Sequence, residues 1–410
     1  MEDKVYIIGA GVSGLIAAYE LEQYGYHPIV IEKSSEVGGR VKTLQENGFA
    51  LDVGFQVLLS AYPLAQKYLD MEKLNLRKLA SGALIYSNGQ AYRIGDPLRN
   101  WNILFPTLLS DIGSIYDKLK ILQLNISLKN KSLKDIFNST EKTTYDYLVD
   151  FGFSTKIINR FFKPFFSGIF LEPDLNTSSR MFEFVYKMFG EGHATIPQLG
   201  IGEISKQLKG KLKHTEFIYN TEVTEMTNDF ITLGSGEKKS HQGVIIASNT
   251  PSLINQEEVK WKSCMCIYFE VDQTNIPQET IALIADTEKF ANNLYAYRDH
   301  STNKTILSVT SLEIKNHTDQ EIIDHVTKEV KHYTGASTIK YIKHYRINKA
   351  LPNRKNLKMT VTEKENRLSE NIFIAGDSLL NGSLNAAMES GRNAAIQLIN
   401  YKKKSLEISQ

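Results

Sequence analysis

A glycine-rich turn near the N-terminus constrains this chain more than any other feature of its sequence. Residues 5–8 are apolar, as in a buried strand, and Gly9, Gly11 and Gly14 follow them in the order GAGVSG. Gly9 permits a tight turn, Gly11 leaves room for a pyrophosphate, and Gly14 lets the next helix approach the strand. The pyrophosphate would lie against free N–H groups at the positive end of that helix. The pattern therefore predicts a strand, a turn and a helix that bind a dinucleotide.

An acidic residue follows at the distance that such a site requires. Residues 28–31 predict a second strand, and Glu32 comes directly after it, 18 positions beyond Gly14. A carboxylate there accepts hydrogen bonds from a ribose 2′-hydroxyl and repels a 2′-phosphate. The same fingerprint serves NAD and FAD, so these residues alone leave the choice of dinucleotide open.

Two further segments carry a resemblance to a known family. They are residues 32–56, EKSSEVGGRVKTLQENGFALDVGFQ, and residues 371–395, NIFIAGDSLLNGSLNAAMESGRNAA. Both resemble the flavin-containing amine oxidoreductase superfamily, which includes monoamine and polyamine oxidases, protoporphyrinogen oxidases and phytoene-type desaturases. The resemblance implies FAD as the cofactor. It places Gly39 and Arg40 over the FAD pyrophosphate, and it brings Gly54 to Gln56 close to the flavin ring.

The C-terminal segment is also consistent with flavin binding on physical grounds. Residues 372–375 predict a short apolar strand that Gly376 breaks, and small residues then begin a helix. The start of a helix stabilises negative charge, and a reduced flavin is negative along one edge. An ordinary strand and helix that close the sheet would show a similar pattern. The resemblance assigns the pyrophosphate and ribityl chain to Gly376 and Asp377, and the flavin pyrimidine to residues 384–386.

The expected contacts with FAD come from the N-terminal motifs, the C-terminal motif and a segment in the middle of the chain. Two of them lie in a middle segment, where the resemblance places the backbone of Val223 at the adenine and Ala247 beside the dinucleotide. The full predicted set is Gly9, Ala10, Gly11, Ser13, Gly14, Glu32, Lys33, Gly39, Arg40, Gly54, Phe55, Gln56, Val223, Ala247, Gly376, Asp377, Leu384, Asn385 and Ala386.

The expected fold class is α/β with two domains, since 410 residues exceed what one core usually supports. A Rossmann-like FAD-binding domain is predicted from three separated segments, residues 1–60, 194–250 and 368–410. Residues 61–193 and 251–367 would then build an α+β substrate domain. The first of these stretches has helical patterning and the second alternates apolar and polar residues, which predicts a mixed or antiparallel sheet over the flavin.

Composition restricts the partners and the compartment. With 48 basic and 46 acidic residues, the formal net charge is +2, which excludes the basic footprint of a nucleic-acid-binding protein. Cys264 and Cys266 stand two apart in an expected strand, so we expect buried thiols in a reducing cytoplasm and neither a disulfide nor a metal site. Both lie outside the C-terminal segment where monoamine oxidases attach their flavin, so FAD is expected to be noncovalent. The N-terminus enters a strand at once, which predicts no signal peptide.

No apolar run reaches the roughly 18 residues that span a bilayer. Residues 101–109, WNILFPTLL, are either a packed helix or an apolar entrance that touches a membrane surface. The aromatic segment 160–170 is either core or one wall of a substrate cavity, with Phe165 and Phe166 as candidates for that wall. The number of subunits is left open.

Catalytic residues stay unassigned, because a flavin supplies the redox chemistry itself. Monoamine oxidases hold a water at the flavin with a lysine, and Ser263 occupies that position here. Lys262 is one residue away, which turns its side chain to the opposite face of a strand. Tyr345 is the nearest candidate for the aromatic residues that flank the flavin in amine oxidases.

Three functions are consistent with the sequence. The leading hypothesis is an FAD-dependent oxidoreductase that dehydrogenates C–C or C–N bonds of a largely apolar small molecule by hydride transfer to flavin N5. A flavin-dependent amine oxidase is the first alternative. A protein that binds FAD without catalysis is the second.

Overall fold

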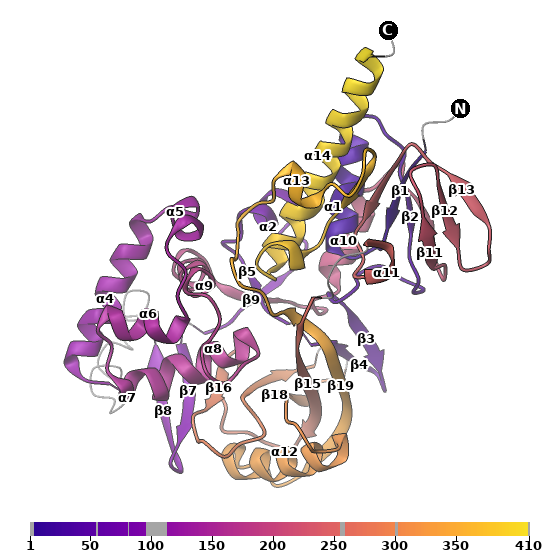
Figure 1. Ribbon diagram of the computed structural model, residues 1–410. Coiled ribbons are helices and arrows are strands. Elements are labelled where there is room, and N and C mark those ends of the chain that lie inside the picture. The colour runs from indigo at the N-terminus through magenta and orange to yellow at the C-terminus, as the bar shows by residue number, and fades with distance from the viewer. Residues whose placement is uncertain are drawn as a thin grey trace.

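The computed structural model describes residues 4–54, 56–80, 82–95, 113–254, 259–299 and 302–408 (Figure 1). The predictions for Phe55 and for residues 101–109 fall outside these ranges. Among the described residues, no helix is both long and apolar enough to cross a membrane.

A five-stranded parallel sheet joins segments from both ends and the middle of the chain. Its order is β10–β2–β1–β14–β20, and every pairing is parallel. The strands are β1 (Val5–Ile8), β2 (Ile29–Ile31), β10 (Glu216–Ile218), β14 (Gly243–Ile246) and β20 (Ile372–Ile374). Parallel strands are covered on both faces, which explains why β1 and β14 are continuous apolar runs.

Two helices cover one face of this sheet and a small antiparallel sheet covers the other. The helices are α1 (Val12–Gln23) and α14 (Leu384–Ile408), which lie side by side in Figure 1 although they are at opposite ends of the chain. The small sheet contains β11 (Val223–Met226), β12 (Phe230–Leu233) and β13 (Lys238–Ser240). This arrangement confirms the predicted Rossmann-like α/β fold.

Glycine permits the close contact between α1 and α14. A Cβ atom added at Gly391 would lie 2.1 Å from the carbonyl oxygen of Ser13. Nothing larger than glycine fits this position unless one helix moves.

A seven-stranded sheet forms the second body of the molecule, in the order β19–β15–β18–β17–β16–β7–β8. The pairing of β16 with β7 is parallel and the other pairings are antiparallel, so the predicted mixed sheet is present. The strands are β7 (Gly82–Ser87), β8 (Gln90–Gly95), β15 (Trp261–Val271), β16 (Ile281–Ile284), β17 (Asn293–Arg298), β18 (Thr305–Leu312) and β19 (Ile339–Pro352). Helix α12 (Asp319–Thr334) packs on one face of this sheet.

A group of helices lies beside the mixed sheet (Figure 1). Its members are α4 (Ile115–Asn130), α5 (Leu133–Asn138), α6 (Thr144–Phe151), α7 (Thr155–Ile157), α8 (Lys163–Phe170) and α9 (Ser179–Glu191), with a π-helical turn (Ile158–Phe162) between α7 and α8. The aromatic segment belongs to its core: Phe166 is 1% exposed, and its ring centroid is 4.8 Å from that of Phe182. Phe165 is partly buried and packs toward the mixed sheet.

Short elements connect these bodies. They are the hairpin of β3 (Thr43–Glu46) and β4 (Phe49–Asp52), the three-stranded sheet of β5 (Leu58–Leu59), β9 (Ala194–Pro197) and β6 (Leu76–Lys78), the helices α2 (Pro63–Tyr68), α10 (Glu203–Lys211), α11 (Pro251–Ile254) and α13 (Glu363–Asn366), and a 3₁₀ turn (Asp377–Leu379). The candidate site described next is built largely from these connections and from the ends of the parallel strands.

Candidate functional site

The glycine turn leaves the N-terminus of α1 open. Gly9 has φ +105° and its N–H donates to the carbonyl oxygen of Ile31 at 2.8 Å. A Cβ atom at Gly14 would lie 2.0 Å from the oxygen of Gly9, which shows how closely the helix approaches the turn. Gly11 is the N-cap, no side chain caps the helix, and a Cβ atom there would meet no atom within 4 Å. The positive end of the helix therefore faces open space.

The segment that contains the second glycine pair lies directly against this turn. The N–H of Gly38 donates to the carbonyl oxygen of Ala10 at 3.0 Å. Gly39 has φ +59°, and a Cβ atom added to it would lie 3.3 Å from Cα of Gly11. The glycine turn and the segment with Gly38 and Gly39 thus form one surface. Each of them needs glycine where the two backbones approach each other.

Arg40 joins this surface to the C-terminal motif. Its guanidinium forms an ion pair with Asp377, which lies 337 positions away in the sequence, and donates to the carbonyl oxygen of Ala350 at 3.1 Å. It also lies 5.0 Å from the centroid of the Trp261 ring. The fold therefore brings the two ends of the predicted pattern into contact.

Glu32 points back toward the glycine turn from the end of β2. One carboxylate oxygen accepts from the N–H of Ala10 at 2.7 Å, and the other accepts from the N–H and hydroxyl of Ser34 at 2.9 and 2.8 Å. A carboxylate has further lone pairs, so these bonds orient it and leave acceptor capacity. The side chain of the next residue, Lys33, is exposed.

The start of α14 lies beside α2. The amide oxygen of Asn385 accepts from the N–H of Leu64 at 3.0 Å, and the N–H of Ala386 donates to the hydroxyl of Ser383 at 3.0 Å. Leu384 is buried between these contacts. The N–H of Gly376 donates to the hydroxyl of Ser390 at 2.8 Å, which ties the end of β20 to the same helix.

The two candidates from the middle segment take different positions. The N–H of Ala247 donates to the carbonyl oxygen of Ile8 at 2.8 Å, and the oxygen of Ala247 would lie 2.9 Å from a Cβ atom at Gly9. Ala247 therefore flanks the glycine turn. Val223 is buried in β11 and its backbone pairs with Leu233.

These residues fit a dinucleotide on the evidence of the structure itself. The end of α1 is uncapped and faces space that a side chain could fill at Gly11, which suits a pyrophosphate. Glu32 supplies a carboxylate that its bonds with Ala10 and Ser34 hold in place at the end of β2. Two residues of this region were not predicted from the sequence, Gly391 and Ser34. No neighbouring residue indicates that Gly391 contacts α1, and a serine two residues after Glu32 does not by itself indicate a hydrogen bond to that carboxylate.

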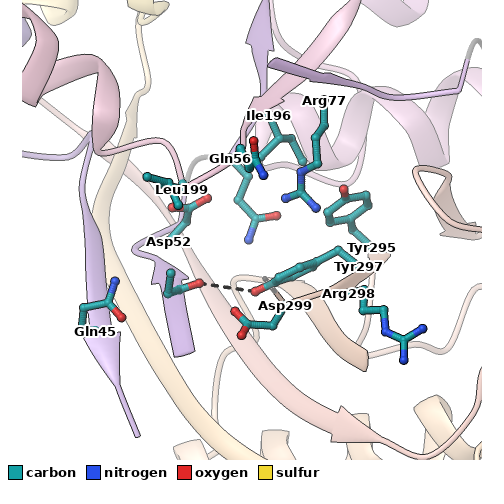
Figure 2. Close-up of a pocket in the computed structure, with 13 residues that line it drawn as sticks. Gln45, Asp52, Gln56, Arg77, Ile196, Leu199, Tyr295, Tyr297, Arg298 and Asp299 are labelled. Carbon is teal, nitrogen blue, oxygen red and sulfur yellow. Dashed lines mark hydrogen bonds between the residues drawn. The ribbon is translucent and has the colours of Figure 1, made fainter. Parts of the chain in front are cut away.

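A cavity of about 160 Å³ lies where the segment after β4 meets β6, β17 and the turn before α10 (Figure 2). Its lining combines apolar surface with polar side chains, among them Asp52, Gln56, Arg77, Tyr295, Tyr297 and Arg298. The side-chain amide of Gln56 donates to the hydroxyls of Tyr268 and Ser308 at 2.6 and 2.8 Å, which fixes the segment expected to pass the flavin ring.

The three predicted cavity residues do not line this cavity. Phe166 lies in the helical core, and the ring of Phe165 packs against Phe161 at 5.8 Å and Phe189 at 5.4 Å. The ring of Tyr345 meets Tyr268 edge-on at 6.3 Å. The burial of Phe166 favours the core alternative for the aromatic segment, and the assignment of Phe165 and Tyr345 to a substrate cavity stays a prediction.

Asp52 is the buried acid of this region. The hydroxyl of Thr43 donates to it at 2.6 Å and the N–H of Ile201 at 2.9 Å. Burial nevertheless raises the pKa of Asp52 to about 6, with the two hydrogen bonds and the nearby Arg77 acting in the opposite direction. A group with this pKa changes charge near neutrality, which is typical of functional sites.

On β15, one lysine and two cysteines take separate roles. The ammonium of Lys262 donates to the carbonyl oxygen of Phe170 at 2.9 Å and to the hydroxyl of Thr177 at 2.7 Å, so it binds the helical group. Burial lowers its pKa. Cys264 and Cys266 are free thiols, and the thiol of Cys266 donates to the carbonyl oxygen of Gly54 at 3.6 Å.

Comparison with known proteins agrees with these features. A family model described as flavin containing amine oxidoreductase matches residues 12–399. Protoporphyrinogen oxidase 2 of Arabidopsis thaliana is 29% identical over 170 residues, which is 40% of this chain and 32% of the relative. The chain thus spans about a third of the length of this relative and of the mitochondrial protoporphyrinogen oxidase of Nicotiana tabacum.

Solved structures show the same fold over nearly the whole chain. An oxidoreductase from Methanosarcina mazei superimposes with a TM-score of 0.73 at 15% identity, covering 95% of this chain and 99% of the other. Cyclohexylamine oxidase from Brevibacterium oxydans superimposes with a TM-score of 0.66 at 15% identity, covering 98% of this chain and 100% of the other.

Proposed function

Because the chain belongs to the flavin containing amine oxidoreductase family, we propose that it is an FAD-dependent oxidoreductase. Its reaction would be the dehydrogenation of C–C or C–N bonds of a largely apolar small molecule. The observation that supports this most is the ion pair between Arg40 and Asp377, because it unites the two motifs on which the flavin assignment rests.

In this proposal the open end of α1, together with Gly39, holds the FAD pyrophosphate. Glu32 accepts from the ribose, and residues 384–386 lie at the flavin. Binding is noncovalent, a proposal supported by the position of both cysteines on β15, outside the C-terminal motif. Two free thiols also favour a reducing compartment such as the cytoplasm.

We also propose that residues 1–60, 194–250 and 368–410 form the FAD-binding domain. Each of these segments contributes strands to the parallel sheet, which supports the division. Residues 61–193 and 251–367 would then form the substrate domain, which holds the mixed sheet and the helical group.

FAD, when bound, supplies the hydride acceptor at flavin N5. The chain itself has to orient the substrate and exclude water. The cavity beside Gln56 is suited to that task, because it adjoins the segment that we expect at the flavin ring. Two carboxylates line it, those of Asp52 and Asp299, and the pKa of Asp52 is raised, so a site for ammonium groups is less well supported.

Anaerobic titration of the bound flavin tests this function. We expect apolar polyenes or porphyrinogen-like ring systems to bleach the flavin, and benzylamine and spermine to leave it oxidised. Rapid bleaching by either amine would support the amine-oxidase alternative, which the similarity to a cyclohexylamine oxidase keeps open. A flavin that none of these compounds reduces would support a protein that binds FAD without catalysis.

A further inference from the structure

One cation in the cavity has an unsatisfied donor. Arg77 lies on β6, and its Nε atom is buried with no hydrogen-bond partner among the residues that the structure describes. Its guanidinium carbon lies 5.5 Å from the centroid of the Tyr297 ring. Figure 2 shows the guanidinium directed toward Tyr295 and Tyr297, into the space that these residues share.

A second donor in the same cavity is also unsatisfied. Tyr295 is 5% exposed, and its buried hydroxyl has no hydrogen-bond partner within the described part of the chain. Tyr295 and Tyr297 are two positions apart on β17, so they share one face of the strand, and their rings stack with centroids 5.6 Å apart. Burial raises the pKa of Tyr295, which keeps the hydroxyl protonated as a donor.

The other charged groups of the cavity are already engaged. Asp52 accepts from Thr43 and Ile201, and Asp299 accepts from the N–H and hydroxyl of Thr302 at 2.8 and 2.9 Å. Arg298 is exposed and donates to the carbonyl oxygen of Asn303 at 3.1 Å. The two unmatched groups of the cavity, Nε of Arg77 and the hydroxyl of Tyr295, can therefore both donate to a ligand.

Buried donors without partners destabilise a fold, so their presence in a cavity points to a ligand that satisfies them. We propose that Arg77 and Tyr295 bind the carboxylate of the substrate, which would be an organic acid with an aromatic or aliphatic remainder. This inference rests on the proposed function, since it gives that function a substrate class.

The geometry suits this chemical group. The planar guanidinium presents parallel N–H donors that match the two oxygens of a carboxylate. The stacked tyrosine rings offer an apolar surface next to these donors. A volume of about 160 Å³ exceeds the roughly 10–15 Å³ that one water needs, so a carboxylate with several carbon atoms can enter.

The test uses two probes that differ only in the anionic group, phenylacetate and phenylacetamide. Each is titrated into the protein as purified, by isothermal calorimetry. We expect phenylacetate to bind at least tenfold more tightly than the amide. Arg77→Gln should weaken phenylacetate binding by at least tenfold, and Tyr295→Phe, which removes only the hydroxyl, by about threefold.

Lys78→Gln is the matched control, because Lys78 is the exposed neighbour of Arg77 on β6 and its loss should leave phenylacetate binding unchanged. Equal binding of the two probes, no phenylacetate binding, or binding that Arg77→Gln leaves unchanged would each overturn the inference. So would binding of inorganic phosphate in place of phenylacetate. Flavin content is measured on the same samples, and its absence would contradict the proposed function while the titration still tests Arg77.

Discussion

The surface expected to hold FAD and the cavity beside Gln56 are built on opposite principles. The FAD surface consists mainly of backbone: Gly11, Gly38 and Gly39 lie against one another, and the end of α1 is open above them. The cavity consists of side chains that come from strands far apart in the sequence, such as Arg77 and Tyr295. Recognition by backbone requires glycine at fixed spacing, and this spacing is visible as a motif in the sequence. Recognition by side chains from distant strands produces no such motif.

The two regions also differ in how their charges are balanced. On the FAD surface, Arg40 is paired with Asp377, and Glu32 accepts from Ala10 and Ser34. In the cavity, the Nε donor of Arg77 and the hydroxyl of Tyr295 have no partner among the described residues. The first region is thus held together by its own contacts, and the second is complete only with a ligand. Each of the following changes tests one side of this contrast.

The largest effect is expected where the FAD-binding layers pack. Gly391→Ala places a Cβ atom 2.1 Å from the oxygen of Ser13, so α14 must move away from α1. We expect the free energy of unfolding to fall by about 4 kcal/mol in urea titrations. Gly210→Ala on α10 is the control, since its Cβ meets nothing within 4 Å and should stabilise the helix by about 0.5–1 kcal/mol. Equal stability of Gly391→Ala and the wild type would contradict the packing argument.

The next effect concerns the buried acid of the cavity. The pKa of Asp52 is about 6 in the folded protein, against 3.8 for an unperturbed aspartate, so the folded state binds more protons between these values. The contribution of Asp52 to stability should therefore fall as the pH rises from about 4 to 6 and should then level off, with a total change of about 3 kcal/mol between the wild type and Asp52→Asn. Urea titrations of both proteins from pH 4 to 8 measure this difference. Identical slopes in both proteins would show that Asp52 does not cause them.

A smaller effect is expected at the contact between the two flavin motifs. Arg40→Ala removes the partner of Asp377, but the arginine side chain is 42% exposed, so water compensates for part of the loss. We expect FAD affinity to fall by about 2 kcal/mol, or roughly 30-fold, in fluorescence titrations of the reconstituted protein. Arg93→Ala, at an exposed arginine on β8, is the control. An equal loss of FAD affinity in both variants would show that Arg40 has no special role in FAD binding.

The contrast between the two regions explains which parts of the fold and of the candidate site could be predicted from the sequence. The turn at Gly9 to Gly14 and the strand before Glu32 follow local rules, and the fold places them as predicted. That the predicted residues bind FAD stays a prediction. The pairing of Arg40 with Asp377 spans 337 positions, yet family resemblance brought both residues into one site.

The cavity could not be predicted in the same way. The alternation around residues 294–298 indicated a strand, but a pattern of period two does not say which face is turned to the cavity. The spacing of Tyr295 and Tyr297 was the available signal. The sequence left two alternatives for Phe165 and Phe166, because a dense aromatic segment is typical both of a helical core and of a cavity wall, and the burial of Phe166 favours the core.

One variant tests the central claim that the open end of α1 is a dinucleotide site. Gly11 has φ −71° and ψ 177°, a conformation that valine adopts, and an added Cβ would meet no atom within 4 Å. Gly11→Val should therefore fold with the stability of the FAD-free wild type but fill the space of the pyrophosphate. Acid release followed by chromatography should yield one FAD per chain from the wild type and none from the variant. Full FAD content in Gly11→Val, or NAD alone in the wild type, would contradict the account.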